Sequence, residues 1–484
     1  MHNHASKLFT FLVIAISFAG CITVGPQYVP PDTTAPDQWM TDAQKSENYE
    51  PINAQALSSW WETFNDPILT GLVKEAVKGN LDLKEARARI REARARRARA
   101  RADRFPVIDA TGTATSHRSS EDTGSGERNE LFTVGFDAGW ELDVFGKVRR
   151  SVEAAQADLE ASREDFRDVL ITLVAEVALN YVEARTFQTR LTVAEANLST
   201  QTETYSLATF RYDAGLTTRL DVEQATYTMN ATRSQTPPLR SSFTEASNRL
   251  AVLLGTYPGA VEEKLSDPKP VPLAPFEIVV GVPAEVLRRR PDVRRAEREV
   301  AAQTARVGVA TAEGYPSFTL PGSIGLEAFP FGDLFSLASR TFSIGPRFSW
   351  NIFDAGAVRH NIAVQDALQE QALIRYDAAI LTALEDVENA LTAYAQEQLR
   401  RTSLTEAAQA AQRAVDLARD QYSAGLIDFQ NVLEAQRSLL SFQDQLATSE
   451  GSVTSNLIRL YKALGGGWSP EESPATVSSD EGQG

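Results

Sequence analysis

The chemistry that is easiest to read from this sequence belongs to one cysteine. Cys21 is the only cysteine among 484 residues, and it closely follows an apolar run from Leu8 to Ala19. About twelve such residues suit the core of a signal peptide and are too few to span a bilayer. The small residues Ala19 and Gly20 before the thiol resemble a lipobox, which predicts cleavage before Cys21 and acylation of its sulfur. The alternative is an ordinary signal peptide followed by an incidental buried cysteine.

The composition argues against several other kinds of chemistry. A single cysteine excludes an intramolecular disulfide, and only four histidines and three methionines argue against a dedicated metal site. A net charge of −16 argues against nucleic acid, whose phosphates repel an acidic protein. The chain contains no nucleophile elbow, phosphate-binding loop or metal-ligand spacing. We therefore expect no catalytic residue, no metal, no cofactor beyond a lipid on Cys21, and no nucleic-acid partner.

A run of nine arginines between Arg87 and Arg104 needs its own interpretation. By itself such a run suggests nucleic-acid binding, but the signal peptide and the overall acidity argue against that. The run ends a predicted helix just before a predicted membrane strand, where cations suit the helix C-terminus and anionic headgroups. A solvated helix face is an equally good explanation, and the sequence leaves this choice open.

The elements that must position these residues occur twice, at a fixed offset of 210 residues without a gap. A match at one offset predicts an internal duplication in which both halves fold alike. The matching segments include Phe105-Pro106 with Tyr315-Pro316, Trp140 with Trp350, Ala214-Gly215-Leu216 with Ala424-Gly425-Leu426, and Leu254-Gly255 with Leu464-Gly465.

Each half is predicted to begin and end with helices. The first helices cover residues 68–104, capped by Asp66, and residues 283–313. The long helices cover residues 147–214 and 357–424, which contain no glycine or proline, and their apolar steps of three and four predict coiled coils about 100 Å long. Each is expected to end at Gly215 or Gly425 and to be followed by a return helix to Leu254 or Leu464. Pro237-Pro238 should break the first return helix.

Between these helices, alternating apolar and polar residues predict membrane-length strands. Residues 131–142 and 341–353 alternate in this way, with hairpin partners at 107–115 and 317–326 and polar turns around 119–129 and 330–339. Four strands cannot close a barrel, whereas three copies would supply twelve. The predicted fold is therefore mainly α with a membrane β-barrel: a long coiled-coil tube plus four strands per protomer, twelve-stranded in a trimer.

These patterns divide the chain into six segments. They are a lipoprotein signal peptide (1–20), an N-terminal connector (21–65), a first repeat (66–255), a linker (256–282), a second repeat (283–465) and a disordered tail (466–484).

The chain resembles the TolC-type outer-membrane efflux family, in its lipoprotein branch of OprM/NodT-like channels. The resemblance covers residues 21–467. It depends on Val24-Gly25-Pro26, on the segments 140–146 and 350–356, on 287–293 followed by Ala296-Glu297, and on 422–425 with 432–437.

This resemblance implies a passive trimeric exit duct of a tripartite efflux pump, exporting drugs or other small molecules. The partners would be two further copies of the chain, outer-membrane lipid, a periplasmic adaptor and an inner-membrane RND pump. The protein would be lipid-anchored in the outer membrane of a Gram-negative bacterium and extend into the periplasm. Alternatives are the exit duct of a type I protein-secretion or metal-efflux system, and a structural periplasmic coiled-coil lipoprotein. The last would leave the strands unexplained, and channel conductance would exclude it.

The resemblance also implies a periplasmic gate at the tips of the long helices. Asn431 and Glu434 match a constricting ring of acidic residues, although the amide at Asn431 departs from some family members. Asp221 and Tyr422 match a pair that ties neighbouring helices, and Arg437 is a possible intrahelical partner of Glu434. The Gly215 and Gly425 turns would dock the adaptor. The alternatives are that Glu434 is an ordinary solvated charge and that Tyr422 belongs to the coiled-coil core.

Overall fold

The computed structural model describes residues 23–32, 35–36, 38–40, 57–124, 126–273 and 283–469. The predicted signal peptide, the lipidation site Cys21, much of the connector, the end of the linker and most of the tail lie outside these residues. The chain divides into two compact units, each assembled from three segments. The first contains Met1–Asp32, Arg89–Arg163 and Arg295–Ala378, and the second contains Thr33–Ala88, Glu164–Arg294 and Ala379–Gly484.

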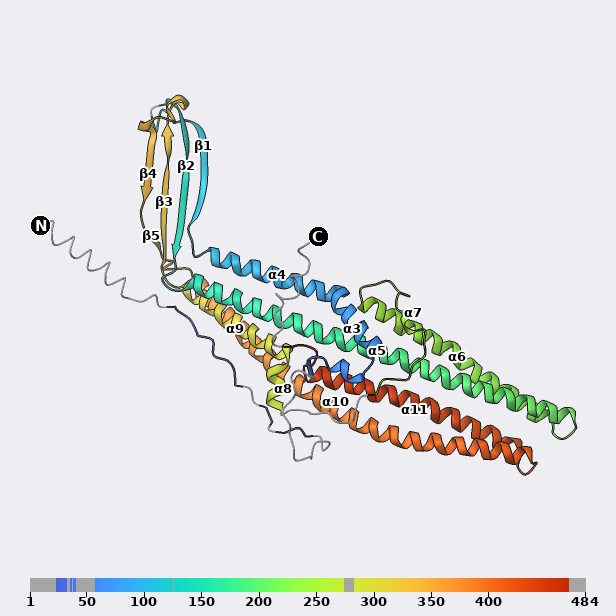
Figure 1. Cartoon of the computed structure of the whole chain (residues 1–484). Coiled ribbons are helices and arrows are strands. Elements are labelled where there is room, and N and C mark those ends of the chain that lie inside the picture. Colours follow the sequence, from blue (N-terminus) through green and yellow to red (C-terminus); the bar gives the residue numbers. More distant parts are fainter. Residues whose placement is uncertain are drawn as a thin grey trace. The chain divides into compact units, whose positions relative to one another are not determined.

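The first unit contains an antiparallel sheet (Figure 1). Its strands are β1 (Val107–Arg118), β2 (Arg128–Leu142), β3 (Ser317–Ala328), β4 (Arg340–Ile344) and β5 (Arg347–Ser349). The order is β1-β2-β3-β4, and β5 pairs with another part of β3. Consequently β1 lies at one edge of the sheet, and β4 and β5 lie at the other.

The prediction of one continuous strand over residues 341–353 was wrong. It forms two short strands, β4 and β5, separated by Gly345 and Pro346, and residues 350–353 lie outside both. Proline lacks the N–H that a ladder needs, so pairing with β3 is interrupted there. The other three strands match the prediction and extend a few residues further toward the turns.

One face of the sheet is apolar and exposed. Phe136 lies opposite Ile324 of β3, which lies opposite Phe342 of β4, and these three side chains are 58%, 65% and 81% exposed. Hydroxyl and carboxylate groups pair elsewhere in the sheet, as in the 2.6 Å contact between Thr113 Oγ1 and Thr133 Oγ1. This alternation confirms the predicted half-apolar strands.

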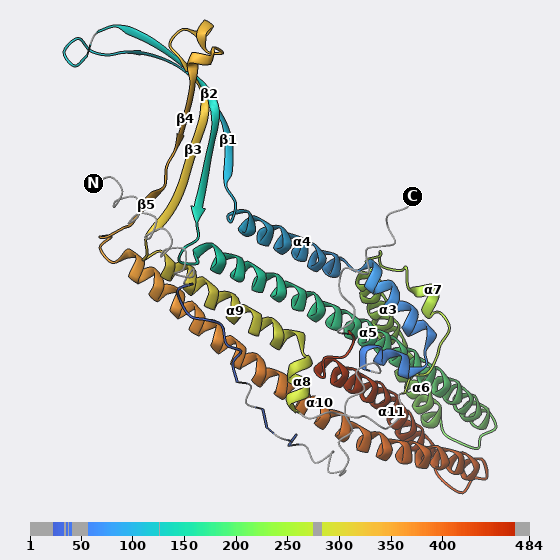
Figure 2. The ribbon, with the colours of Figure 1, turned by 60° about the vertical axis from the view of Figure 1, so that its left-hand side comes forward.

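Four helices contribute to the first unit and lie side by side in the order α4, α5, α9, α10 (Figure 2). Their bounds are α4 Leu81–Ala102, α5 Lys147–Asp213, α9 Pro291–Ala312 and α10 Ala357–Ser423. The two long helices, α5 and α10, have 67 residues each, as their lack of glycine and proline predicted. Helices α4 and α10 form the two ends of this row.

The helices predicted at residues 68–104 and 283–313 are each divided in two. Asp66 caps α3 (Pro67–Gly79) by accepting hydrogen bonds from the N–H groups of Ile68 and Leu69, as predicted. Asn80 then separates α3 from α4: its amide donates to the Leu253 carbonyl, and its side-chain oxygen caps α4. Arg290 separates α8 (Pro283–Arg289) from α9, and its guanidinium donates to the Ala463 carbonyl.

The return helices are α6 (Arg219–Leu253) and α11 (Phe429–Ala463). The predicted break at Pro237-Pro238 was wrong, because α6 runs through both prolines without interruption. The carbonyls that lose their helical donors belong to Arg233 and Ser234, which are exposed, as are both prolines. Water can satisfy these carbonyls, so the missing bonds cost less than in a buried helix.

Short elements complete the described part of the chain. They are η2 (Trp60–Phe64), α7 (Glu262–Leu265), η3 (Phe331–Asp333) and η4 (Leu337–Ser339). Among the described residues, no helix is both long enough and apolar enough to cross a membrane.

Candidate functional site at the helix tips

Each long helix of the second unit turns back at a glycine. Gly215 and Gly425 have φ angles of +69° and +74°, which favour a residue without a Cβ. Leu216 N–H donates to the Arg211 carbonyl, and Gly215 N–H donates to the Tyr212 carbonyl. This pair of bonds is a Schellman C-cap. The second turn has the same bonds, so both tips are closely defined hairpins.

A small apolar core holds the two hairpins together. Ala208 of α5 and Ala225 of α6 share a buried cluster with Tyr422, Phe429 and Leu433 of the other hairpin. The rings of Tyr422 and Phe429 lie 5.1 Å apart. The tips therefore contact each other within a single copy of the chain.

Arg211 adds a polar clamp to this core. Its guanidinium group lies 4.7 Å from the centre of the Tyr422 ring. The same group donates hydrogen bonds of 3.2 and 3.3 Å to the carbonyls of Tyr422 and Ser423. These are terminal carbonyls of α10, which carry partial negative charge, so Arg211 of one hairpin caps the helix of the other.

Asp221 and Tyr422, the pair that the family resemblance implies to tie neighbouring helices, are not hydrogen-bonded to each other in one copy of the chain. The Asp221 carboxylate accepts from the Thr217 hydroxyl, and the buried Tyr422 hydroxyl has no hydrogen-bond partner among the described residues. Burial raises the pKa of the Tyr422 phenol, opposed by the nearby Thr217 and Arg211. Tyr422 is thus a neutral member of the tip core.

The residues predicted for the constriction lie on the first turns of α11. Asn431 and Glu434 are exposed, and the Asn431 amide donates to the Asp428 carbonyl at 3.3 Å. Glu434 lies 3.8 Å from Arg437, which also donates to the Tyr227 hydroxyl of α6 at 2.5 Å. An exposed pair at this distance contributes little stability, so the Glu434 charge remains available to solvent.

A polar ladder along α5 was missed by the sequence interpretation. Arg190 binds Asp444 of α11 through two bonds of 2.7 and 3.0 Å. Asn197 pairs with Gln443, and Thr204 accepts from Gln436. The α5 members of the ladder, and Arg211 beyond them, recur every seven residues, the period of coiled-coil contacts. The seven-residue spacing on α5 could have been recognised in the sequence, but the partner residues on α11 could not have been identified from it.

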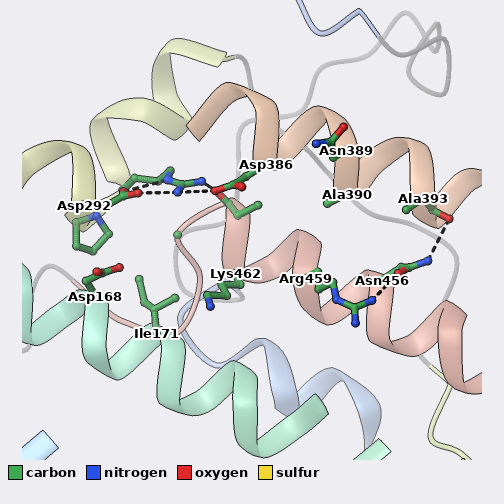
Figure 3. Close-up of a pocket in the computed structure, with 14 residues that line it drawn as sticks. Asp168, Ile171, Asp292, Asp386, Asn389, Ala390, Ala393, Asn456, Arg459 and Lys462 are labelled. Atoms are coloured by element: carbon green, nitrogen blue, oxygen red, sulfur yellow. Dashed lines mark hydrogen bonds and ion pairs between the residues drawn. The ribbon is translucent and has the colours of Figure 1, made fainter. Parts of the chain in front are cut away.

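A separate cavity of about 450 Å³ lies where α5, α9, α10 and α11 meet in the second unit. In Figure 3, Asp292 and Asp386 lie on either side of a cation, and dashed lines mark the ion pairs that each carboxylate makes with it. The shared cation is Arg290, which is 8% exposed and lies 2.6 Å from Asp292 and 2.9 Å from Asp386. Because Arg290 binds one carboxylate from α9 and one from α10, the cluster joins these two helices.

Comparisons with known proteins agree on one family. The family model described as "Outer membrane efflux protein" matches residues 72–256 and 282–466. Nodulation protein T of Rhizobium leguminosarum bv. trifolii is 32% identical over 472 residues, covering 96% of this chain and 98% of the relative. The solvent efflux pump outer membrane protein SrpC of Pseudomonas putida is 30% identical over 472 residues, covering 96% and 100%. The solved outer-membrane channel OprN aligns with a TM-score of 0.86 at 37% identity, over 92% of this chain and 99% of that chain.

Proposed function

The chain belongs to the outer membrane efflux protein family, and we propose that three copies of it form the exit duct of a tripartite pump. The protein is an outer-membrane efflux channel, and members of this family are channels rather than enzymes. The proposed assembly is a closed barrel in the membrane that continues into a tube of helices. We also propose that the recurrence of elements at an offset of 210 residues reflects a duplicated gene segment.

The observation that best supports the assembly is a sheet with an exposed apolar face and two open edges. Unpaired strand edges are not tolerated in hydrocarbon, so β1 of one copy needs a partner. The opposite edge, β4 and β5, can supply that partner from the next copy. Each copy supplies β1, β2, β3 and the divided strand made of β4 and β5, so three copies give a barrel of about twelve strands, within the range of known membrane barrels.

The long helices suit a passive tube. At 1.5 Å per residue, α5 and α10 are each about 100 Å long. Nothing in the described part of the chain supplies energy, so we propose that a periplasmic adaptor docks at the Gly215 and Gly425 turns and an inner-membrane pump drives export. The exported compounds would be drugs or other small molecules, by analogy with the solvent pump component SrpC.

Conductance tests this function. We expect the purified protein in planar lipid bilayers to form long-lived channels, and particles in detergent to show threefold symmetry. Monomeric rods that extract without detergent and do not conduct would instead support a structural coiled-coil lipoprotein.

The same recordings test the proposed gate. We expect Glu434→Gln to reduce cation selectivity, because three carboxylates focus a negative potential in a narrow throat.

We also propose that Cys21 is the lipidated N-terminus of the mature protein. Mass spectrometry of the membrane-extracted protein should show a chain starting at Cys21 with acyl chains attached. Cys21→Ala should abolish that mass shift. A mature wild-type protein that begins elsewhere and carries no lipid would leave Cys21 as an incidental residue.

A further inference from the structure

The arginines of α4 play no part in the channel as described so far. Helix α4 lies at one end of the row of helices in the first unit (Figure 2). Arg91 on this helix is exposed, and the described part of the chain offers it neither an ion pair nor a hydrogen bond. A solvated arginine needs no explanation by itself, but the helix at the other end of the row carries groups that complement it.

Helix α10 forms the other end of the row and presents the complementary chemistry. Asp366 and Glu370 are exposed, one turn apart, and neither has an ion-pair or hydrogen-bond partner among the described residues. Beside them lie exposed apolar side chains, including Ala367 and Ile374, the latter 58% exposed. An apolar strip flanked by carboxylates on a helix edge is typical of a surface that another helix covers.

The chain contains a template for how such edges meet. Within the first unit, α5 packs antiparallel against α9, and Ala157 shares a buried cluster with Ala301 and Ala302. Ion pairs border this contact, between Arg306 and Asp158 at 2.6 Å and between Arg298 and Glu160 at 3.2 Å. Small residues in the centre and opposite charges at the sides therefore define this type of contact.

The offset of 210 residues transfers this template to the two free edges. Position 301 of α9 corresponds to Arg91 of α4, while Ala157 and Glu160 of α5 correspond to Ala367 and Glu370 of α10. Helices α4 and α10 stand at opposite ends of the row, so this contact requires a second copy of the chain. In it, Arg91 would lie beside Ala367, within reach of both carboxylates.

We infer that α4 of one copy packs against α10 of the next, with Arg91 placed between Asp366 and Glu370 of its neighbour. This inference rests on the proposed trimer and identifies residues that select the neighbouring copy. Opposite charges at a helix seam specify partner and register more than they add stability. The acidic edge would recognise the arginine edge and repel a second acidic edge.

The α5–α9 contact within one copy (the template) and the proposed α4–α10 contact between copies (the seam) differ in one respect, which explains why an arginine occupies position 91. In the template, Tyr28 of the N-terminal segment packs against Ala157, Ala301 and Ala302, and its hydroxyl donates to Glu297 at 2.6 Å. The segment containing Tyr28 occurs once per chain, so the seam between copies has no equivalent ring. The larger side chain of Arg91 fills that groove.

Another arginine of α4 provides a control. Arg94 corresponds to Thr304 of α9 at the offset of 210 residues, and the Thr304 hydroxyl accepts a hydrogen bond from Gln369 of α10 in the same copy. We therefore expect Arg94 to face α5 of its own copy. Arg96 is unsuitable as a control, because it corresponds to Arg306, which borders the template contact.

Charge reversal tests the seam. We expect Arg91→Glu to lower the trimer fraction in detergent at least tenfold by native mass spectrometry, because three carboxylates would then face one another in each seam. The double variant Asp366→Lys/Glu370→Lys should have the same effect. Combining all three substitutions should restore the trimer, which excludes simple misfolding. Arg94→Glu makes the same charge change on the same helix and should leave the trimer intact.

The outcomes separate this inference from the proposed function. A wild-type protein that is monomeric would overturn the trimeric duct itself. A wild-type trimer that is unaffected by Arg91→Glu would overturn only the seam. If that variant also lost co-purifying phosphatidylglycerol or cardiolipin, the arginine edge would face lipid headgroups rather than a second copy. Failure of the triple variant to recover, with helicity unchanged, would likewise contradict the pairing.

Discussion

Replacing Arg290 by methionine is expected to lower the free energy of unfolding of the channel by about 2 kcal/mol, the cost of losing charge-assisted hydrogen bonds from a buried cation to two partly exposed carboxylates. Arg290 binds two carboxylates, Asp292 and Asp386, and donates to the Ala463 carbonyl at 3.1 Å. Methionine matches its volume approximately but provides no donor. Loss of the cation would leave two carboxylates close together in the cavity, and they would repel each other.

The measurement is urea unfolding of the detergent-solubilised protein, followed by circular dichroism. Arg288→Met is the matched control, since Arg288 lies two residues away and is exposed, and it should change the midpoint little. Arg290→Lys should fall between the two, because lysine restores the charge but not the planar fork that reaches both carboxylates. Equal midpoints for Arg290→Met and Arg288→Met would contradict the role assigned to this cluster.

Arg290 also illustrates where the sequence patterns stopped being informative. The apolar period predicted one helix over residues 283–313, whereas the structure interrupts it at Arg290. Asn80 interrupts the first-half helix at the corresponding position. Both side chains bind the carbonyl of the last residue of a return helix, Leu253 or Ala463. Such a partner lies more than 170 residues away, so local periodicity contains no trace of it.

The bounds of the two long helices were easier to predict than the interruptions within the shorter helices. Helices α5 and α10 end within one residue of the predicted positions, because the absence of glycine and proline and the left-handed glycine cap are local properties. Two predictions that involved prolines were wrong: a strand was predicted to run through Pro346, and a helix was predicted to break at Pro237-Pro238. Pro346 divides a strand, while α6 accommodates Pro237 and Pro238 at positions where these prolines and the residues that lose a hydrogen-bond donor, Arg233 and Ser234, are exposed.

The positions of the helix tips were predicted from the sequence, but the contacts between the tips were not. The glycine turns located both tips correctly, and the tyrosine and acidic residues were found there. The contact that joins the hairpins, from Arg211 to the end of α10, was not foreseen. Its partners are backbone carbonyls and a ring face, and neither leaves a complementary charge in the sequence.

Arg211→Gln is expected to favour separation of the tips. The substitution removes a cation–π contact and two charge-assisted hydrogen bonds to α10, together worth about 2 kcal/mol. If the hairpins part when the duct opens, that energy corresponds to about a 30-fold increase in the ratio of open to closed channels. Single-channel recording in planar bilayers measures this ratio directly. Glutamine keeps the length and polarity of the side chain, so the helix itself should be unaffected.

Tyr422→Phe is the informative control for the clamp. Phenylalanine preserves the ring beneath Arg211 and the backbone carbonyl that accepts the hydrogen bond from Arg211. The substitution removes only the Tyr422 hydroxyl, which has no hydrogen-bond partner in the described residues. Its open probability should therefore match that of the wild type. If Tyr422→Phe opened the channel as much as Arg211→Gln, a hydroxyl contact made only in the assembled duct would hold the gate. If neither variant changed the open probability, the hairpins would move as one body, and the gate would lie between copies of the chain.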